Sequence, residues 1–277
     1  IKCFYPAEFL TALLYAQPLG FYTPDTLISD AQRHGVSVIA PCLKRSQWYS
    51  HLDGDDVIVG LRWVRGLGPK AKAVLETARN AGSFNTLDEV FRRCVLSKSA
   101  WLTLVGADTF RALTYGDRRQ ATWHVLRQIA NRQLSLDLRP KSELPVELCA
   151  LSPVGNMKHD YENMGLTTGA HPMSFYREAL TKSTTTSSML SQLRHGQWVR
   201  VAGVVVARQR PETAKGFCFI SLEDEFGFIN VIVTPSHYER YWREITRSRL
   251  LIISGTLSAQ EDELNVKALH IEALATD

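Results

Sequence analysis

The spacing of apolar residues predicts a helix that begins at Pro69. Four apolar residues follow it at positions i, i+3, i+4 and i+7, namely Ala71, Val74, Leu75 and Ala78. This spacing places them on one face of a helix. Proline suits the first helical position because its missing N–H would have no partner there.

Two glycines precede this helix, in the sequence Arg65-Gly66-Leu67-Gly68. We expect a short amphipathic helix before them, so that the segment forms a helix, a hairpin and a second helix. Glycine adopts backbone angles that other residues avoid, and it allows another molecule to approach closely. The first N–H groups of the second helix lack intrahelical partners and stand at the positive end of its dipole, so they form an anion site.

Five residues of this segment are candidates for binding DNA phosphates without reading sequence, and they form a helix-hairpin-helix pattern: Arg65, Gly66, Gly68, Lys70 and Lys72. The alternative interpretation is an ordinary helical hairpin whose basic face is solvated. Two glycines in a turn are common, so the motif gains its weight from the proline, the lysines and the helical spacing around them.

Further helices and one short strand are predicted on both sides of the hairpin. A Thr86–Glu89 capping box marks the start of one helix, because each side chain can satisfy a free donor at the helix end. The region 46–56 is polar and rich in turn-forming residues. The remaining predicted elements are helices at 6–14, from Pro24 to before Gly35, at 98–104 and at about 117–132, and a β-prone run at 36–39.

The periodicity changes to that of β-strands from Gly196 onward. Strands are predicted at 198–209, 217–222, 228–233, 250–257 and 264–271, with a helix at 236–246 between the third and the fourth. This order is that of a five-stranded OB-fold barrel. The fold class is therefore multidomain α + β, with a helical part followed by an OB-fold β-barrel.

The barrel has its own candidate site for single-stranded nucleic acid or a partner protein. Three basic residues lie at its first loop, namely Arg208, Arg210 and Lys215, and three aromatic residues lie on the next two strands, namely Phe217, Phe219 and Phe228. Aromatic rings above a basic rim bind single strands by stacking. The alternative is that these aromatics belong to the barrel core, and the net charge of the domain, −1, does not favour tight capture of an anion.

The distribution of charge indicates nucleic acid as the partner of the helical part. Residues 1–135 carry 17 Lys and Arg against 11 Asp and Glu, a net charge of +6, whereas 136–193 and 194–277 each carry −1. Within 57–80 there are five basic residues and one acidic residue. A local excess of this kind is typical of a phosphate-binding surface.

The placement of the cysteines and the hydropathy of the chain indicate the cellular compartment in which the protein is expected. The five cysteines are scattered and never form a CxxC pair, which argues against a disulfide framework and a zinc site and favours a reducing cytoplasm. The histidines lack metal-ligand spacing, and we expect no metal site. No apolar run is long enough to span a membrane, so we expect a soluble, cytoplasmic protein with no membrane partner.

Several stretches resemble bacterial DNA polymerase III alpha subunits. YPAEFLTALL (5–14), QPLGFY (17–22) and DAQRHGV (30–36) are similar to the fingers region of that family. The hairpin unit, together with LVGAD (104–108) and DRR (117–119), resembles its tandem helix-hairpin-helix domain, and GL (165–166) with HPM (171–173) resembles its connector. The loop at 208–216, with LEDEFG (222–227) and NVIV (230–233), resembles the error-prone, ImuC-type translesion branch.

The resemblance implies four segments. These are the end of the polymerase fingers at 1–55, a tandem helix-hairpin-helix DNA-binding domain at 56–135, a connector and flexible linker at 136–195, and an OB-fold domain at 196–277. The flexibility of the linker is predicted from composition, because this segment contains four prolines and the Thr and Ser run at 184–188. The chain begins without methionine, so we expect it to be the carboxy-terminal part of a longer protein. The family's catalytic carboxylates lie in a palm domain that nothing here matches, so we expect no catalytic residue in this chain.

For the parent enzyme the resemblance implies DNA-directed DNA synthesis with Mg²⁺, in translesion synthesis, DNA repair and damage-induced mutagenesis. The implied partners are duplex and single-stranded DNA, an accessory mutagenesis protein and the sliding clamp. Two alternatives are a free-standing, non-catalytic DNA-binding adaptor that joins the same modules and an RNA-binding protein with an OB-fold. The fingers-like stretch at 5–36 argues against the adaptor.

Overall fold

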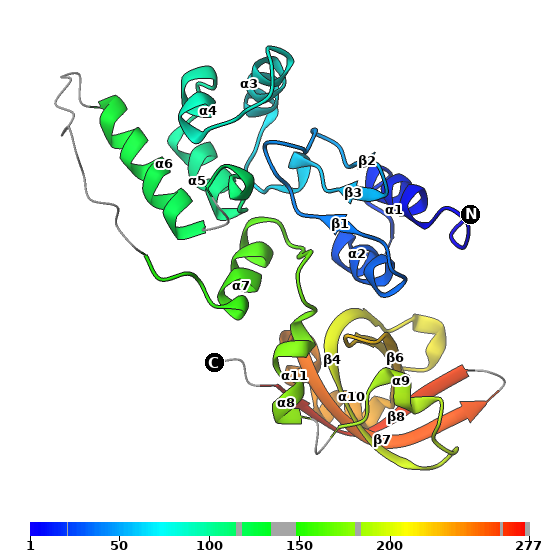
Figure 1. Cartoon of the computed structure of the whole chain (residues 1–277). Helices are drawn as coiled ribbons and strands as arrows, with labels where there is room; N and C mark the ends of the chain where they lie inside the picture. Colours follow the sequence, from blue (N-terminus) through cyan, green and yellow to red (C-terminus); the bar gives the residue numbers. More distant parts are fainter. Residues whose placement is uncertain (21, 115–117, 134–147, 181–183, 261–262, 275–277) are drawn as a thin grey trace. The chain divides into compact units, whose positions relative to one another are not determined.

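The computed structural model describes the chain except for residues 21, 115–117, 134–147, 181–183, 261–262 and 275–277. The described residues form two compact units, Ile1–Gln17 with His34–Gly169, and Pro18–Arg33 with Ala170–Asp277 (Figure 1). A segment from the amino-terminal part of the chain therefore joins the carboxy-terminal barrel. The predicted boundaries at 56, 136 and 196 do not coincide with this division and stay predictions.

The first unit contains a small sheet beside helix α1 (Pro6–Tyr15). Its strands are β1 (Val38–Ile39), β2 (His51–Asp53) and β3 (Asp56–Ile58), in the order β1-β3-β2. β1 pairs with β3 in parallel and β2 pairs with β3 in an antiparallel hairpin. We predicted β1, but not β2 and β3, because their short runs lie among the turn-forming residues of 46–56.

The rest of the first unit is helical. Its elements are η1 (Leu61–Trp63), α3 (Pro69–Asn80), α4 (Leu87–Arg93), α5 (Lys98–Gly106), η2 (Arg111–Leu113), α6 (Arg118–Gln133) and α7 (Pro153–Asn163). Polar caps begin several of them: the amide of Glu89 donates to Thr86 Oγ1 at 3.2 Å, and its side chain accepts from the amide of Asn85 at 3.0 Å. The predicted capping box is thus confirmed, with the Glu carboxylate on the residue before the cap.

The short helix predicted before the hairpin forms as the single 3₁₀ turn η1. Strand β3 and the extended Gly60 precede it. Gly60 lies so close to the chain at Trp48 and Tyr49 that a Cβ atom would come within 2.5 Å of their backbone. Any side chain at position 60 would therefore clash with that backbone.

The second unit contains a closed barrel and the helices around it. The strands are β4 (Trp198–Gln209), β5 (Cys218–Glu223), β6 (Phe228–Val233), β7 (Leu250–Gln260) and β8 (Glu263–Ala273), in the closed order β4-β5-β6-β8-β7. β6 and β8 pair in parallel, and the other neighbours pair in antiparallel fashion. The predicted five-stranded OB-fold is confirmed, and its helical insertion forms as α10 (Pro235–Arg240) and α11 (Trp242–Arg247).

Alternation along the strands fills the barrel. Cys218, Ile220 and Leu222 of β5 point inward to one apolar core, and the residues between them point outward. Around the barrel lie α2 (Pro24–Arg33), η3 (Pro172–Phe175), α8 (Arg177–Leu180) and α9 (Ser187–Leu190). In the described ranges, no helix combines the length and the apolar character that crossing a membrane requires.

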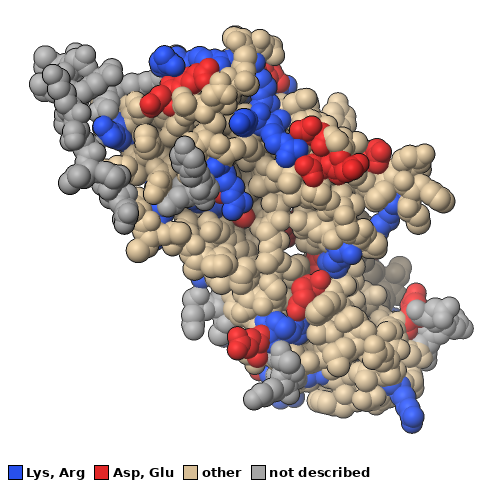
Figure 2. Space-filling model, in the orientation of Figure 1, with Lys and Arg blue, Asp and Glu red and all other residues tan. Residues whose placement is uncertain are grey.

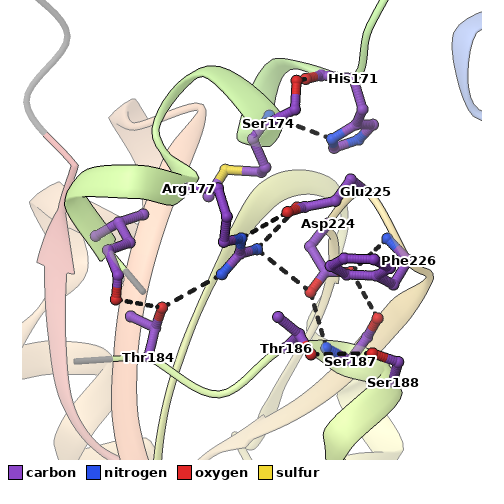
Figure 3. Close-up of polar contacts among 12 residues, drawn as sticks. His171, Ser174, Arg177, Thr184, Thr186, Ser187, Ser188, Asp224, Glu225 and Phe226 are labelled. Atoms are coloured by element: carbon purple, nitrogen blue, oxygen red, sulfur yellow. Dashed lines mark hydrogen bonds and ion pairs between the residues drawn. The ribbon is translucent and has the colours of Figure 1, made fainter. Parts of the chain in front are cut away.

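The Thr and Ser run at 184–188, predicted to be part of a flexible linker, is held against the barrel. The amide of Thr185 donates to the carbonyl of Arg200 at 2.6 Å. Ser187 donates to Asp224 through both its amide, at 2.8 Å, and its hydroxyl, at 2.5 Å (Figure 3). Composition pointed to flexibility, but a backbone hydrogen bond from Thr185 and two hydrogen bonds from Ser187 to a buried carboxylate hold the run in place.

Candidate nucleic-acid interface

The hairpin bends through two glycines with different backbone conformations. Gly66 has φ of +86°, in the left-handed region that favours glycine, whereas Gly68 is extended, with φ of −93° and ψ of 179°. Gly68 is the N-cap of α3, and no side chain caps this helix end. Pro69 then occupies the first turn, as the sequence predicted.

The amide groups of the bend face solvent. Gly66, Gly68 and Lys70 are exposed, and within the described part of the chain the amides of Gly66 and Gly68 have no hydrogen-bond partner. The Lys70 amide belongs to the first turn of a 12-residue helix, where intrahelical acceptors are missing. The bend therefore presents free donors at the positive end of a helix dipole, which is the arrangement that binds phosphate oxygens.

The two lysines of the hairpin differ in their surroundings. Lys70 is exposed, and among the described residues no carboxylate pairs with it. Lys72 is half-buried, lies 3.7 Å from Glu76 and stands over the rings of Trp48 and Tyr49. Lys70 thus presents an exposed ammonium group with no carboxylate partner among the described residues. The ammonium group of Lys72 instead makes cation–π contacts with its aromatic neighbours.

Arg65 is held by the end of α7. Its amide donates to the carbonyl of Asn163 at 2.8 Å and its guanidinium donates to the carbonyl of Glu162 at 3.3 Å. The last carbonyls of a helix lack intrahelical donors and carry the negative end of its dipole, so an arginine is stabilised there. Arg65 therefore positions the hairpin in addition to contributing charge near it.

Basic side chains are visible on the surface around α3. Figure 2 shows a run of Lys and Arg crossing the part of the first unit in which Figure 1 places α3, with acidic side chains grouped beside it. Sequence reasoning missed Tyr15, Trp48, Tyr49 and Arg62, which also lie by the hairpin. The signal that could have found them is the QWY run (47–49), aromatic residues in an otherwise polar loop.

The structure separates the barrel aromatics that the sequence grouped. Phe219 and Phe228 lie on the outer face and are 39% and 40% exposed, whereas Phe217 precedes β5 and is half-buried. The outer face is therefore not the barrel core at these positions. The Arg33 guanidinium, however, stands 5.3 Å from the centre of the Phe228 ring, so α2 covers one end of this face.

The three basic residues of the first barrel loop mostly contact the barrel itself. The Arg208 guanidinium donates to the carbonyl of Ser248, and burial lowers its pKa. Arg210 stacks on Tyr238, with its guanidinium 4.4 Å from the ring centre, and donates to the carbonyl of Gly216 at 3.3 Å. Lys215 is exposed and adopts a left-handed conformation with φ of +48°.

The acidic run 223–225 is occupied by donors from the same unit. Asp224 is fully buried and accepts from Ser187 and from the amides of Phe226 and Gly227 at 2.9 and 3.0 Å. Arg177 binds both oxygens of Glu225 at 2.5 and 2.8 Å (Figure 3). Burial acts to raise the pKa of Glu225, but the hydrogen bonds from Arg177 and a backbone amide, together with the charge of Arg177, outweigh it and lower the pKa.

Burial shifts two further groups of this unit. It raises the pKa of Glu223 to about 7, against the opposing effect of the Arg33 hydrogen bond. It lowers the pKa of His171 to about 4, and His171 Nδ1 accepts from the amide of Met173 at 3.2 Å. Of the other acidic pair, Asp55 is in the turn between β2 and β3, and Asp56 begins β3 and accepts from Ser37 and Arg45.

The described residues contain no cluster of three His, Cys, Asp or Glu side chains that fits a metal ion. The carboxylates that are close in sequence are engaged by arginines, hydroxyls and amides.

Comparisons with known proteins agree with the geometry. A family model described as a helix-hairpin-helix motif matches residues 35–121, and one described as an OB-fold nucleic acid binding domain matches residues 199–274. Among solved structures, the asparaginyl-tRNA synthetase of Pyrococcus horikoshii matches 32% of this chain and 22% of its own, with 21% identity and a TM-score of 0.28.

Curated relatives match nearly the whole chain. The error-prone DNA polymerase of Burkholderia mallei is 38% identical over 280 residues, which cover 97% of this chain and 25% of the relative. The error-prone DNA polymerase of Rhodopirellula baltica is 37% identical over 286 residues, which cover 99% of this chain and 25% of the relative. The chain thus spans about a quarter of the length of these relatives.

Proposed function

Because the chain is homologous over nearly its whole length to a portion of the error-prone DNA polymerases, we propose that it is the carboxy-terminal portion of such an enzyme and holds duplex DNA through its hairpin. The observation that carries this proposal is the exposed bend at Gly66 and Gly68 with its unpartnered amides. Free donors, a helix dipole and the Lys70 ammonium group converge there on a site for a phosphate oxygen.

Contacts of this kind bind every sequence equally. Backbone amides and lysines reach the phosphates and carry no information about the bases. A polymerase portion with such a hairpin would hold the duplex whatever base sequence passes through the enzyme. Its role would be to position the DNA, and we place the palm carboxylates and their Mg²⁺ in the remainder of the parent enzyme.

For the whole parent protein we extend the proposal to translesion synthesis in DNA repair and damage-induced mutagenesis in the bacterial cytoplasm. The barrel would meet single-stranded template or a partner, such as an accessory mutagenesis protein or the sliding clamp. The exposed ring of Phe219 favours stacking on a base, whereas the contacts of Arg208 and Arg210 within the barrel leave less charge for a nucleic acid.

The test is duplex binding by Lys70→Ala as a function of salt. Each phosphate contact contributes about 0.9 to the slope of log affinity against log salt, so loss of Lys70 should lower the slope by about 1 and weaken all duplex sequences alike. Fluorescence anisotropy of the full chain with two unrelated blunt duplexes measures both. Lys98→Ala removes an equally exposed lysine from the start of α5 and is the matched control. An unchanged slope in Lys70→Ala would refute the hairpin as the duplex grip.

A further inference from the structure

Three aromatic side chains gather beside the hairpin within the first unit. Tyr15 ends α1, and Trp48 and Tyr49 lie in the loop before β2. The rings of Tyr15 and Tyr49 are tilted at 46° with their centres 5.0 Å apart. Tyr15 is 61% exposed and Tyr49 is 41% exposed, so much of this aromatic surface is open to solvent.

Two cations of the helix-hairpin-helix segment hold these rings. Arg62 stands 5.2 Å from the centre of the Tyr49 ring and donates to the carbonyl of Tyr15 at 3.4 Å. Lys72 stands 5.4 Å from the centre of the Tyr49 ring and 5.6 Å from that of Trp48. The aromatic group is therefore fixed to the same backbone that presents the phosphate site.

A cavity of about 480 Å³ adjoins two of these three rings. Trp48 and Tyr49 form part of its wall, and Gln47, Glu76 and Asn80 add donors and acceptors. Its volume lies within the range of about 300 to 1,000 Å³ that is typical of ligand sites. Aromatic walls with a few amide and carboxylate groups suit a planar heterocycle, which stacks on its faces and hydrogen-bonds at its edges.

The chemistry of the surroundings selects the ligand. A packing role alone would bury the Tyr15 and Tyr49 rings, and an apolar peptide would gain nothing from the adjacent Arg62 and Lys72. A nucleotide matches both features, because its base stacks on aromatic rings and its phosphate is attracted by the cations.

We propose that Tyr15, Trp48 and Tyr49 form a stacking platform for an unpaired base of DNA, next to the phosphate-binding hairpin. This proposal rests on the proposed duplex grip and deepens it: the first unit would hold the junction at which a duplex becomes single-stranded. The hairpin takes the phosphates of the paired part, and the platform takes the first base that has no partner.

The experiment compares a blunt duplex with the same duplex carrying a short single-stranded extension, on either the 5′ or the 3′ side. The full chain should bind one of the extended duplexes about tenfold more tightly, as stacking of one or two bases provides. The double change Tyr15→Ala and Tyr49→Ala should lower the affinity for the extended duplex about tenfold more than the affinity for the blunt duplex, and so remove this preference. Tyr15→Phe with Tyr49→Phe keeps the rings and should keep the preference.

The two proposals fail differently. If Lys70→Ala weakens blunt-duplex binding but the wild-type chain shows no preference for an extension, or the alanine pair retains it, the hairpin stands and the platform is refuted. If Lys70→Ala leaves blunt-duplex binding unchanged, the duplex grip itself is refuted.

A second measurement needs no variant. A 2-aminopurine base at the first unpaired position should lose fluorescence when the wild-type chain binds, because it stacks on a ring, and the same base inside the duplex should change little. Equal responses at the two positions would overturn the platform even if the alanine pair failed to fold.

Discussion

The Arg33 guanidinium lies 2.6 Å from a carboxylate oxygen of Glu223, 190 positions away in the sequence. The same guanidinium stands over the ring of Phe228, the cross-strand partner of Glu223 in β6. One side chain from α2 thus covers a buried carboxylate and an aromatic ring of the barrel. This contact explains why the segment Pro18–Arg33 belongs with the barrel and not with the residues on either side of it.

Loss of Arg33 should destabilise the second unit. Arg33→Met keeps the length of the side chain but leaves the largely buried Glu223 without its cation, and breaking a buried pair in this way costs about 3 kcal/mol. Urea unfolding of the full chain at pH 8, followed by circular dichroism, measures the change. Arg200→Met, which breaks the half-exposed pair with Glu272, should cost less than about 1 kcal/mol.

Glu223 should make the stability of this unit fall as the pH rises. Its folded-state pKa is raised from 4.5 to about 7, so the native state holds a proton that the unfolded chain releases. The stabilisation is fully present below about pH 4.5 and is lost as the pH rises through 7, by roughly 3 kcal/mol in total. Glu223→Gln should remove this dependence, and urea midpoints at several pH values between 4.5 and 8 test it.

His171 should act in the opposite direction. Its folded-state pKa is lowered from 6.5 to about 4, so the unfolded chain binds a proton that the native state rejects. Stability is therefore present above about pH 6.5 and is lost as the pH falls toward 4. His171→Asn keeps an acceptor for the amide of Met173 and should flatten this loss on the acid side. If its acid-induced loss of stability matched that of the wild-type chain, the buried neutral imidazole would not be its source.

The turn after β5 should depend on Asp224. Its carboxylate accepts from Ser187 and from two amides of its own turn, and it is fully buried. Asp224→Ala leaves these donors without an acceptor and should cost about 3 kcal/mol. Asp224→Asn retains one oxygen and should cost less. Thermal unfolding of the two variants measures the difference, and equal losses would show that the oxygen retained in asparagine contributes nothing to stability.

The two hairpin glycines should respond differently to alanine. Gly66 has a positive φ, and alanine there costs roughly 1–2 kcal/mol. Gly68 is extended, and nothing lies within 4 Å of the Cβ atom that alanine would add, so Gly68→Ala should fold normally. Thermal melting tests the fold, and anisotropy with a blunt duplex then tests whether the added methyl group hinders the approach of a phosphate.

The sequence pattern predicted those helices and strands that are determined by neighbouring residues. The bounds of β4 and β6 were predicted residue for residue, because β-branched and apolar residues run along both and turn residues end them. The helix after Pro69 was predicted for the same kind of reason. The short helix before the hairpin was predicted in place, but its 3₁₀ geometry was not.

The candidate sites were likewise predictable only where their residues are close in the sequence. Gly66, Gly68 and Lys70 form a local motif, and the structure places them together at an exposed bend. Two contacts join separate segments: Arg33 with Phe228, and Tyr15 with Tyr49. No pattern of residue spacing predicts such contacts. The aromatic set on the barrel was therefore read as one surface, although α2 covers part of it.

The hydrogen bonds from Arg65 to the end of α7 couple the connector to the hairpin that we propose binds DNA. Because these bonds join the hairpin to residues about a hundred positions downstream, the hairpin cannot change its orientation unless the end of α7 moves or the bonds break. A displacement of α7, for example by a bound partner, would therefore move the proposed phosphate site without direct contact. Variants of the connector should change the affinity for duplex DNA before they change other properties.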